Sequence, residues 1–347
     1  MRMVIKQLLI FLHKEFTEGA NTLPLNLKQG ELKSEVKNNR PQEPVKPYPY
    51  NEEEVVFENS EANVSLSGTL TLPRNNKKSP VVILISGSGP QDRDETVANH
   101  KPFWILADYL TRQGIAVLRF DDRGVGKSTG NFSEATTADF STDVLSAVAF
   151  LKTRPDIDSN NIGLIGHSEG GIIAPLAANQ TKDVSFIVLL ASTGIPGSEI
   201  SLIQSISMRP FPVPNEAAYE QAIRKAIAIA ASDKELSVIK SELLEHYNAT
   251  ITPILKPMVG DDEKVSQIIN GLIETRTTPW VRYFYNYNPA DEIEKLDIPV
   301  LSLNGTNDTQ VVAEINQKGI KDALIRGKNK DFKVLKLEGL NHFFQES

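Results

Sequence analysis

The sequence predicts an α/β fold: a mostly parallel, doubly wound sheet, with antiparallel strands at its start and a helical cap inserted later. Three observations lead to this prediction. Short apolar segments alternate with helical patterns over most of the chain. A serine flanked by glycines, Ser168, lies between a strand pattern and a helix pattern. About a hundred residues without a strong strand pattern interrupt the alternation.

The composition suits one large globular domain with an insertion. The 347 residues are 40% hydrophobic and 23% charged. The net charge of −7 argues against a nucleic-acid surface, because binding phosphates needs clustered Lys and Arg. The chain has no cysteine, which excludes disulfides, thiolate metal sites and cysteine nucleophiles.

Residues 1–52 are interpreted as an N-terminal segment and a proline-rich linker, poorly structured or used for targeting. Residues 1–12 resemble a weak export signal, but Lys6 interrupts the apolar run and no cleavage site follows. A cytoplasmic protein is therefore favoured, with export to the periplasm as the alternative. The apolar run is too short to span a bilayer, and no other segment approaches that length.

The catalytic domain is predicted to comprise residues 53–191 and 298–347. Residues 53–57 and 64–73 are expected to form an antiparallel pair, and the alternation in 64–73 predicts a half-exposed strand. Residues 81–85 are apolar throughout, which is typical of a strand buried on both faces, and later segments continue the series of strands. These strands are expected at 81–85, 115–120, 162–165, 186–190, 300–303 and 332–337, with helices at 103–113, 138–152 and 169–179.

Residues 192–297 are predicted to form the cap, with helices near 216–231, 234–247 and 262–274. Ligands in open α/β sheets bind beyond the carboxyl ends of the strands, where such a cap would lie. The alternative is an insertion with no role in binding.

Residues 166–170, Gly-His-Ser-Glu-Gly, match the turn that carries the nucleophile in many hydrolases. Side chains at the two glycine positions would collide where strand and helix approach each other. The turn would expose Ser168 and place the Glu169 N–H at the positive end of a helix, as a donor to an oxyanion. A chance match in a glycine-containing loop is the alternative.

A serine nucleophile needs a base and an acid that orients it. His342 follows the last predicted strand and is our candidate base; a surface or helix-capping histidine is the alternative. The other histidines fit less well, since His167 is expected to point away from Ser168 on the sharp turn. The remaining three are His13 in the N-terminal segment, His100, and His246 in a charged cap helix.

Asp308 follows the strand before His342 and is the candidate acid, with a simple turn residue as the alternative. Asp291 and Asp297 both precede that strand. The second oxyanion donor is expected at the Ser88 N–H, in the glycine-rich turn after the first buried strand.

Two charged loops follow buried strands. Arg93 could bind a substrate carboxylate, but local salt bridges are the favoured interpretation. Residues 121–128 end in Gly-Lys-Ser like a phosphate-binding loop, yet Asp121 occupies a position that needs glycine. We therefore interpret this loop as a structural turn beside the active site, with its Asp and Arg residues paired.

Residues 86–94, 121–128 and 166–171 together resemble the serine esterases of the α/β-hydrolase superfamily, in particular a bacterial carboxylesterase group that includes dienelactone-hydrolase-like proteins. The resemblance covers roughly residues 53–347. It implies Ser168 as nucleophile, Asp308 as acid and His342 as base. Ser86 stands where many hydrolases have histidine before the glycine of the oxyanion loop.

The expected function is hydrolysis of small or medium carboxylic esters through an acyl-enzyme, with a small-molecule ester as partner and no metal or organic cofactor. A peptidase or aminoacyl hydrolase with the same triad is the alternative, and a non-catalytic binding protein is a second one. The substrate pocket is expected to be lined by aromatic residues that could equally form core. These are Phe103, Trp104, Trp280, Tyr283 and Phe284.

Overall fold

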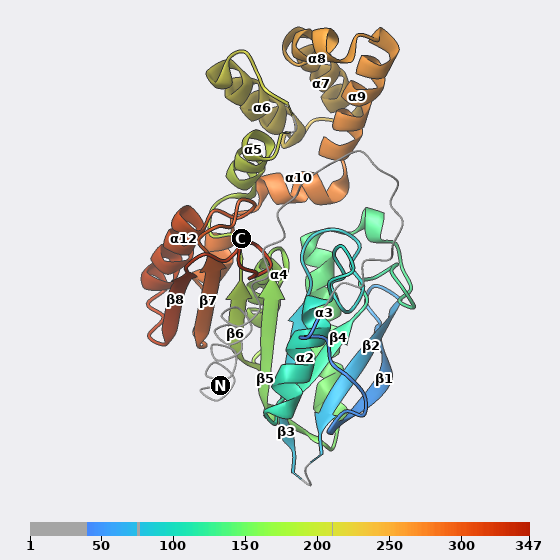
Figure 1. Ribbon diagram of the computed structural model, residues 1–347, viewed down its shortest axis with the longest axis vertical. Helices are drawn as coiled ribbons and strands as arrows, with labels where there is room; N and C mark the ends of the chain where they lie inside the picture. Colours follow the sequence, from blue (N-terminus) through green and yellow to red (C-terminus); the bar gives the residue numbers. More distant parts are fainter. Residues whose placement is uncertain (1–39, 75–76, 210) are drawn as a thin grey trace.

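The computed structural model describes residues 40–74, 77–209 and 211–347. One sheet has the strand order β1-β2-β4-β3-β5-β6-β7-β8 (Figure 1). Strand β2 runs antiparallel to both of its neighbours, and all other pairs from β4 to β8 are parallel. The strands are β1 (Tyr50–Asn59), β2 (Val64–Pro73), β3 (Ser79–Ile85), β4 (Ala116–Phe120), β5 (Ile157–His167), β6 (Val184–Leu190), β7 (Val300–Gly305) and β8 (Phe332–Leu337). The predicted mixed sheet is confirmed. Of the N-terminal segment expected at 1–52, residues 1–39 lie outside the described residues, 40–49 form no helix or strand, and 50–52 already belong to β1.

The prediction that β2 is half exposed is wrong. Its polar positions Ser67, Thr69 and Thr71 are buried as fully as its apolar ones. Thr71 Oγ1 lies 2.6 Å from the hydroxyl of Thr111, and the hydroxyls of Ser67 and Thr69 accept hydrogen bonds from Arg93. Alternating polarity in β2 therefore marks a face that is covered by polar contacts, not one that is open to water.

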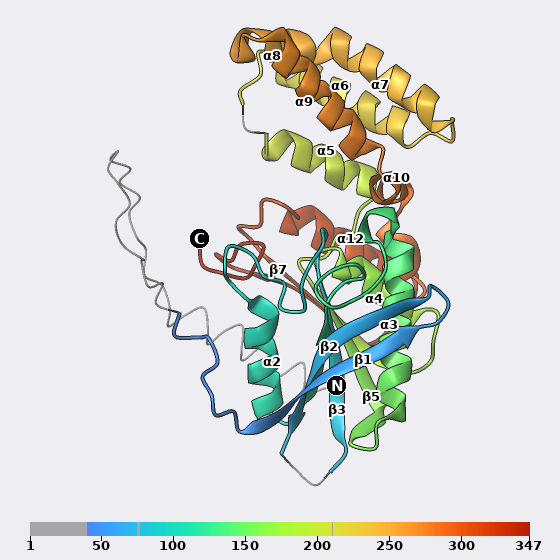
Figure 2. The same cartoon turned by 90° about the vertical axis from the view of Figure 1, so that its right-hand side faces the viewer.

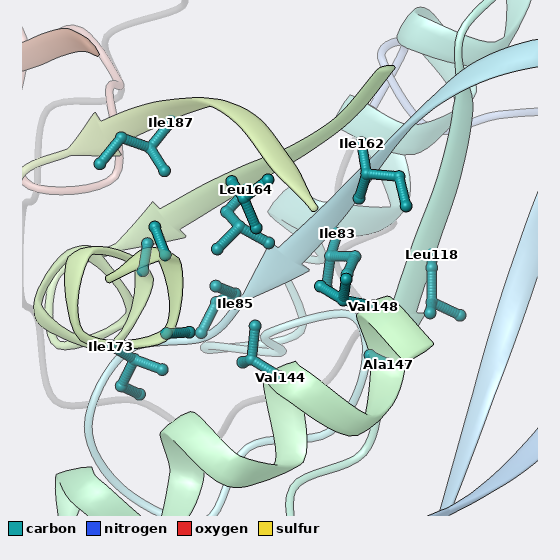
Figure 3. Close-up of a cluster of buried hydrophobic side chains, with 14 of the residues drawn as sticks. Ile83, Ile85, Leu118, Val144, Ala147, Val148, Ile162, Leu164, Ile173 and Ile187 are labelled. Atoms are coloured by element: carbon teal, nitrogen blue, oxygen red, sulfur yellow. The ribbon is translucent and has the colours of Figure 1, made fainter. Parts of the chain in front are cut away.

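Helices cover both faces of the sheet (Figure 2). One face packs against α2 (Pro102–Arg112) and the C-terminal residues Leu340 and Phe344. The other face packs against α3 (Thr137–Thr153), α4 (Gly170–Ala178), α11 (Pro289–Ile293) and α12 (Ala313–Arg326). Figure 3 shows the centre of this second layer, where Val144 and Val148 of α3 and Ile173 of α4 meet Ile83, Ile85 and Leu164 of the strands. The short 3-10 helix η1 (Phe132–Glu134) precedes α3.

A helical cap with its own apolar core lies beyond the carboxyl ends of the strands (Figure 1). The three helices expected there are α6 (Glu216–Ala230), α7 (Leu236–Thr250) and α9 (Asp262–Arg276). Three further helices without a clear sequence signal complete the cap: α5 (Gly197–Ser207), α8 (Thr252–Val259) and α10 (Pro279–Asn286). The cap meets the catalytic domain where Ile172 of α4 packs against Ile200 and Phe284.

The end of the predicted insertion packs on the catalytic domain. Ala290 and Ile293 of α11, followed by Leu296, belong to the same apolar core as α3, α4 and the sheet. Within the described ranges, no helix combines the length and the hydrophobicity that crossing a bilayer requires.

Candidate active site

The strand β5 and the helix α4 meet in a tight turn that carries Ser168. Ser168 adopts a left-handed φ of 52°, and its N–H donates to the carbonyl oxygen of Leu190 at 2.8 Å. A Cβ added at Gly166 would lie 2.0 Å from the Gly170 oxygen, and one at Gly170 would lie 2.1 Å from the Ile85 oxygen. Both glycines are therefore required sterically, as expected for a strained turn that raises a side chain above the sheet.

His342 and Asp308 lie together at the carboxyl ends of β8 and β7. The Nδ1 atom of His342 is 2.7 Å from Oδ2 of Asp308. The other oxygen, Oδ1, accepts the N–H groups of Gln310 and Val311 at 2.9 and 2.8 Å. Both side chains are buried. The carboxylate is thus held on three sides and orients the imidazole with Nδ1–H toward Asp308, which leaves Nε2 as the basic nitrogen.

Burial lowers the pKa of His342 below its usual range. The hydrogen bond that His342 donates to Asp308 opposes this lowering, and the neighbouring His167 adds to it. The lowered pKa favours the neutral imidazole, which is the form that a general base needs.

His167 does not point away from the site, contrary to our expectation. Its ring centre lies 4.7 Å from that of His342, and its Nε2 is 2.9 Å from the His342 carbonyl oxygen. Its Nδ1 is 2.8 Å from Oε1 of Glu95. The turn that carries Ser168 and the loop that carries His342 are therefore in direct contact.

The loop after β3 lies against the Ser168 turn. A Cβ added at Gly87 would lie 3.2 Å from the Cβ of Ser168. The Gly87 N–H already donates to Glu95 Oε1 at 2.7 Å, whereas the next residue, Ser88, is exposed. Glu169 stands at the N-terminal end of α4. In the part of the chain that the structure describes, the N–H groups of Ser88 and Glu169 have no hydrogen-bond acceptor.

The side chain of Glu169 is buried between the catalytic domain and the cap. Its Oε1 accepts hydrogen bonds from Trp280 Nε1 at 2.6 Å and from Thr137 Oγ1 at 2.8 Å. Burial raises the pKa of Glu169 to about 7, even though both hydrogen bonds act in the opposite direction.

The loop after β3 and the loop at 121–128 are connected by ion pairs and hydrogen bonds. Arg93 forms a two-pronged ion pair with Asp121 and also reaches Glu54, so the favoured interpretation of local salt bridges holds. Asp122 accepts from Ser86 Oγ at 2.9 Å and from the Gln91 N–H at 2.9 Å. Burial raises the pKa of Asp122 to about 8. The loop at 121–128 is thus a structural turn that supports the loop after β3.

The pairing predicted for this turn takes a different form. Arg123 does not pair with Asp121 or Asp122 but with Asp143 of α3, at 2.7 Å from Nε to Oδ2. The turn is therefore attached at two points, to the loop after β3 through its aspartates and to α3 through its arginine.

The five aromatic residues expected to line a substrate pocket lie in three places. Phe103 of α2 is buried in the core, and Trp104 of the same helix contacts Lys101, the residue before the helix. Trp280 stacks on Phe284 at 5.2 Å, and Tyr283 stacks on Tyr287 at 5.6 Å, all on or beside α10.

A cavity that our sequence analysis did not anticipate opens beside the loop after β3. Its walls include Ser86, Gly87, Glu169, Phe120, Phe132 and Phe140.

Within the described ranges, no three His, Asp or Glu side chains are placed to hold a metal ion. His246 bonds the Ala222 carbonyl inside the cap, and His100 is half buried in the loop before α2. His13 lies outside the described residues.

Comparison with known proteins shows similarity to hydrolases. The family model described as serine aminopeptidase, S33, matches residues 102–239, which include the Ser168 turn. Esterase EstD of Thermotoga maritima is 27% identical over 290 residues, which cover 82% of this chain and 60% of EstD. This chain has the α/β-hydrolase fold.

The chain is also similar in sequence to a peptidase, and it shares its fold with an esterase of known structure. Proline iminopeptidase of Lactobacillus delbrueckii is 24% identical over 68% of this chain and 78% of its own length. The esterase Pf2001 of Pyrococcus furiosus shares the fold with a TM-score of 0.53 at 17% identity, over 85% of this chain and 84% of that one. The chain spans 60% of the length of EstD and about half (49%) of the next curated relative.

Sequence reasoning missed two residues that the structure brings to the site, Glu95 and His167. Both were visible, Glu95 in the charged loop after β3 and His167 beside Ser168. No sequence spacing relates them, because they meet only when β3 and β5 pair in the sheet.

Proposed function

We propose that this α/β-hydrolase is a serine carboxylesterase that acts on small or medium carboxylic esters through an acyl-enzyme. The observation that carries the proposal is the buried pair of His342 and Asp308, whose Nδ1 and Oδ2 atoms are 2.7 Å apart. The loop that carries His342 contacts the Ser168 turn. A histidine oriented by a carboxylate beside a serine on a strained turn is the arrangement that makes a hydroxyl nucleophilic.

In the proposed reaction, Ser168 Oγ attacks the ester carbonyl carbon while its proton moves to Nε2 of His342. Asp308 stabilises the imidazolium that forms. The N–H groups of Ser88 and Glu169 bind the oxyanion, and both are free of internal acceptors in the described chain. His342 then protonates the departing alkoxide. Water, deprotonated by His342, attacks the acyl-enzyme and releases the acid and Ser168.

A second candidate function is an aminopeptidase or aminoacyl hydrolase with the same triad. It is favoured by the matching family model, described as serine aminopeptidase, and by the similarity to a proline iminopeptidase. The two functions differ in the leaving group, which is an amine in place of an alcohol.

The test compares p-nitrophenyl esters of increasing acyl length with aminoacyl p-nitroanilides, for the wild type and Ser168→Ala. A fluorophosphonate probe reports the nucleophile independently of the substrate. We expect ester hydrolysis and probe labelling, both lost in Ser168→Ala. Faster cleavage of the anilides would select the aminopeptidase. A wild type that is neither labelled nor active on either panel would leave only a non-catalytic binding role.

A further inference from the structure

Two buried side chains that the proposed reaction does not use lie between the active-site loops. Glu95 belongs to the loop after β3, and His167 is the last residue of β5. Their exposed fractions are 2% and 4%. Since Glu95 Oε1 is 2.8 Å from His167 Nδ1, the two side chains form one hydrogen-bonded unit inside the protein.

This unit contacts three of the segments that carry proposed catalytic groups: the loop after β3, the Ser168 turn and the His342 loop. Glu95 Oε1 also accepts the N–H of Gly87 at 2.7 Å, directly before the proposed oxyanion donor Ser88. His167 Nε2 lies 2.9 Å from the carbonyl oxygen of His342. His167 itself precedes Ser168 in the turn.

The acceptors around His167 determine where its protons lie. A carbonyl oxygen can only accept, so Nε2 must carry a hydrogen. An ionised Glu95 likewise requires a hydrogen on Nδ1. An ionised Glu95 and a His167 with both nitrogens protonated together form an ion pair. Burial alone would lower the pKa of His167, but the charge and hydrogen bond of Glu95, together with the His342 carbonyl, outweigh it and raise the pKa.

The backbone of Glu95 supports a specific role. Its φ of 52° lies in the left-handed region, which is unfavourable for a residue with a Cβ. Such conformations persist where surrounding contacts impose them, and they gather at functional sites. Here the contacts are the two bonds of its carboxylate, to Gly87 and to His167.

We propose that Glu95 and His167 are positioning residues, a buried ion pair that fixes the oxyanion loop and the His342 loop relative to Ser168. This inference rests on the proposed function, because the loops are catalytic only if Ser168 and His342 act as nucleophile and base. The charged groups that face His342 are then Asp308, His167 and Glu95. The cation on His167 opposes protonation of His342.

The first test is Glu95→Gln, which keeps the shape of the side chain. The amide oxygen can still accept from Gly87 and from Nδ1–H of His167, but it gives the imidazolium no counter-charge. If His167 instead loses the proton on Nε2, that nitrogen and the His342 carbonyl oxygen become two facing acceptors. We expect kcat to fall roughly 10- to 100-fold with little change in KM, since misplaced catalytic groups affect the transition state more than binding. An unchanged kcat would overturn the proposal.

The second test is the pH dependence of kcat/KM in His167→Gln. Removing the cation beside His342 raises the pKa of that base, so the acid limb of the profile should move to higher pH. The control is His246→Gln, which removes another buried histidine bonded to a carbonyl, 2.8 Å from Ala222, inside the cap. In His246→Gln the acid limb of the kcat/KM profile should stay at the same pH as in the wild type. If the acid limb also stays there in His167→Gln, the proposal is contradicted.

The third measurement needs neither a variant enzyme's activity nor a substrate. Ring nitrogen-15 NMR of the wild type, with the His167 signals assigned by their loss in His167→Gln, should show both nitrogens protonated above pH ~7, where free histidine is neutral. A neutral ring would refute the ion pair. Activity that survives in Ser168→Ala would instead refute the proposed function, so the two failures are distinguishable.

Discussion

The indole of Trp280 donates a hydrogen bond to the carboxyl of Glu169, with 2.6 Å between Nε1 and Oε1. Trp280 belongs to α10 of the cap, and Glu169 is the residue after the proposed nucleophile. The cap is thus attached at the active site itself, through the residue whose N–H is proposed to bind the oxyanion. This contact therefore couples the position of the cap to the geometry of the Ser168 turn.

Trp280→Phe keeps the ring stacked on Phe284 but removes the donor. We expect the free energy of unfolding to fall by about 1–2 kcal/mol, because Glu169 loses one of its two buried partners. kcat should fall several-fold as the Glu169 backbone loses its anchor. Urea unfolding and ester kinetics measure the two effects. Trp104→Phe on α2 is the control and should change kcat little.

Glu169→Gln tests the raised pKa of that carboxyl. With a pKa of about 7 in the folded state against 4.5 as its ordinary value, Glu169 holds its proton more tightly when the protein is folded. The wild type should therefore lose stability relative to Glu169→Gln as pH rises from about 4.5 to 7, by about 3 kcal/mol at most. Denaturant unfolding at a series of pH values measures this difference. A constant difference would mean that the carboxyl is not perturbed.

Asp308→Asn should reduce kcat roughly 10³- to 10⁴-fold, because an amide cannot stabilise the imidazolium of His342 or fix its tautomer. Folding should be retained, since the amide oxygen can still accept from Gln310 and Val311. The matched control is Asp291→Asn on α11, away from His342. If Asp308→Asn kept near-normal turnover, the acid would have to lie elsewhere.

The acid limb of kcat/KM should have its midpoint below about 6.5, the ordinary value for histidine. Only neutral His342 can accept the Ser168 proton, and its lowered pKa keeps it neutral to lower pH. Initial rates at low substrate concentration across pH 5 to 8 measure the midpoint. A midpoint above 6.5 would show that Asp308 dominates over burial.

Two glycine substitutions should act in opposite directions. In Gly170→Ala the new Cβ would meet the Ile85 backbone oxygen at 2.1 Å, so the turn must distort and the protein should be strongly destabilised. In Gly271→Ala, inside α9, nothing lies within 4 Å of the new Cβ. That variant should gain about 0.5–1 kcal/mol from helix propensity. Thermal unfolding of both variants measures the contrast.

Much of the architecture could be predicted from local patterns. The continuous apolar strands and the turn at Ser168 determine the sheet and the place of the proposed nucleophile, because burial on both faces and steric crowding act over a few residues. The helices α6, α7 and α9 were predictable for the same reason. The helices α5 and α10 were not, since they pack against each other and, through Ile200 and Phe284, against Ile172 of α4.

The sequence by itself determined the chemistry that is available: one serine on a strained turn, and an aspartate and a histidine each placed after a later strand. Only the tertiary structure decided which side chains surround them. Glu95 reaches His167, and Trp280 reaches Glu169, across 72 and 111 positions of sequence. Such contacts depend on how strands order in the sheet and how the cap packs on it. Hydrogen bonds of this kind leave no periodic pattern in the chain, because each needs only one residue on either side.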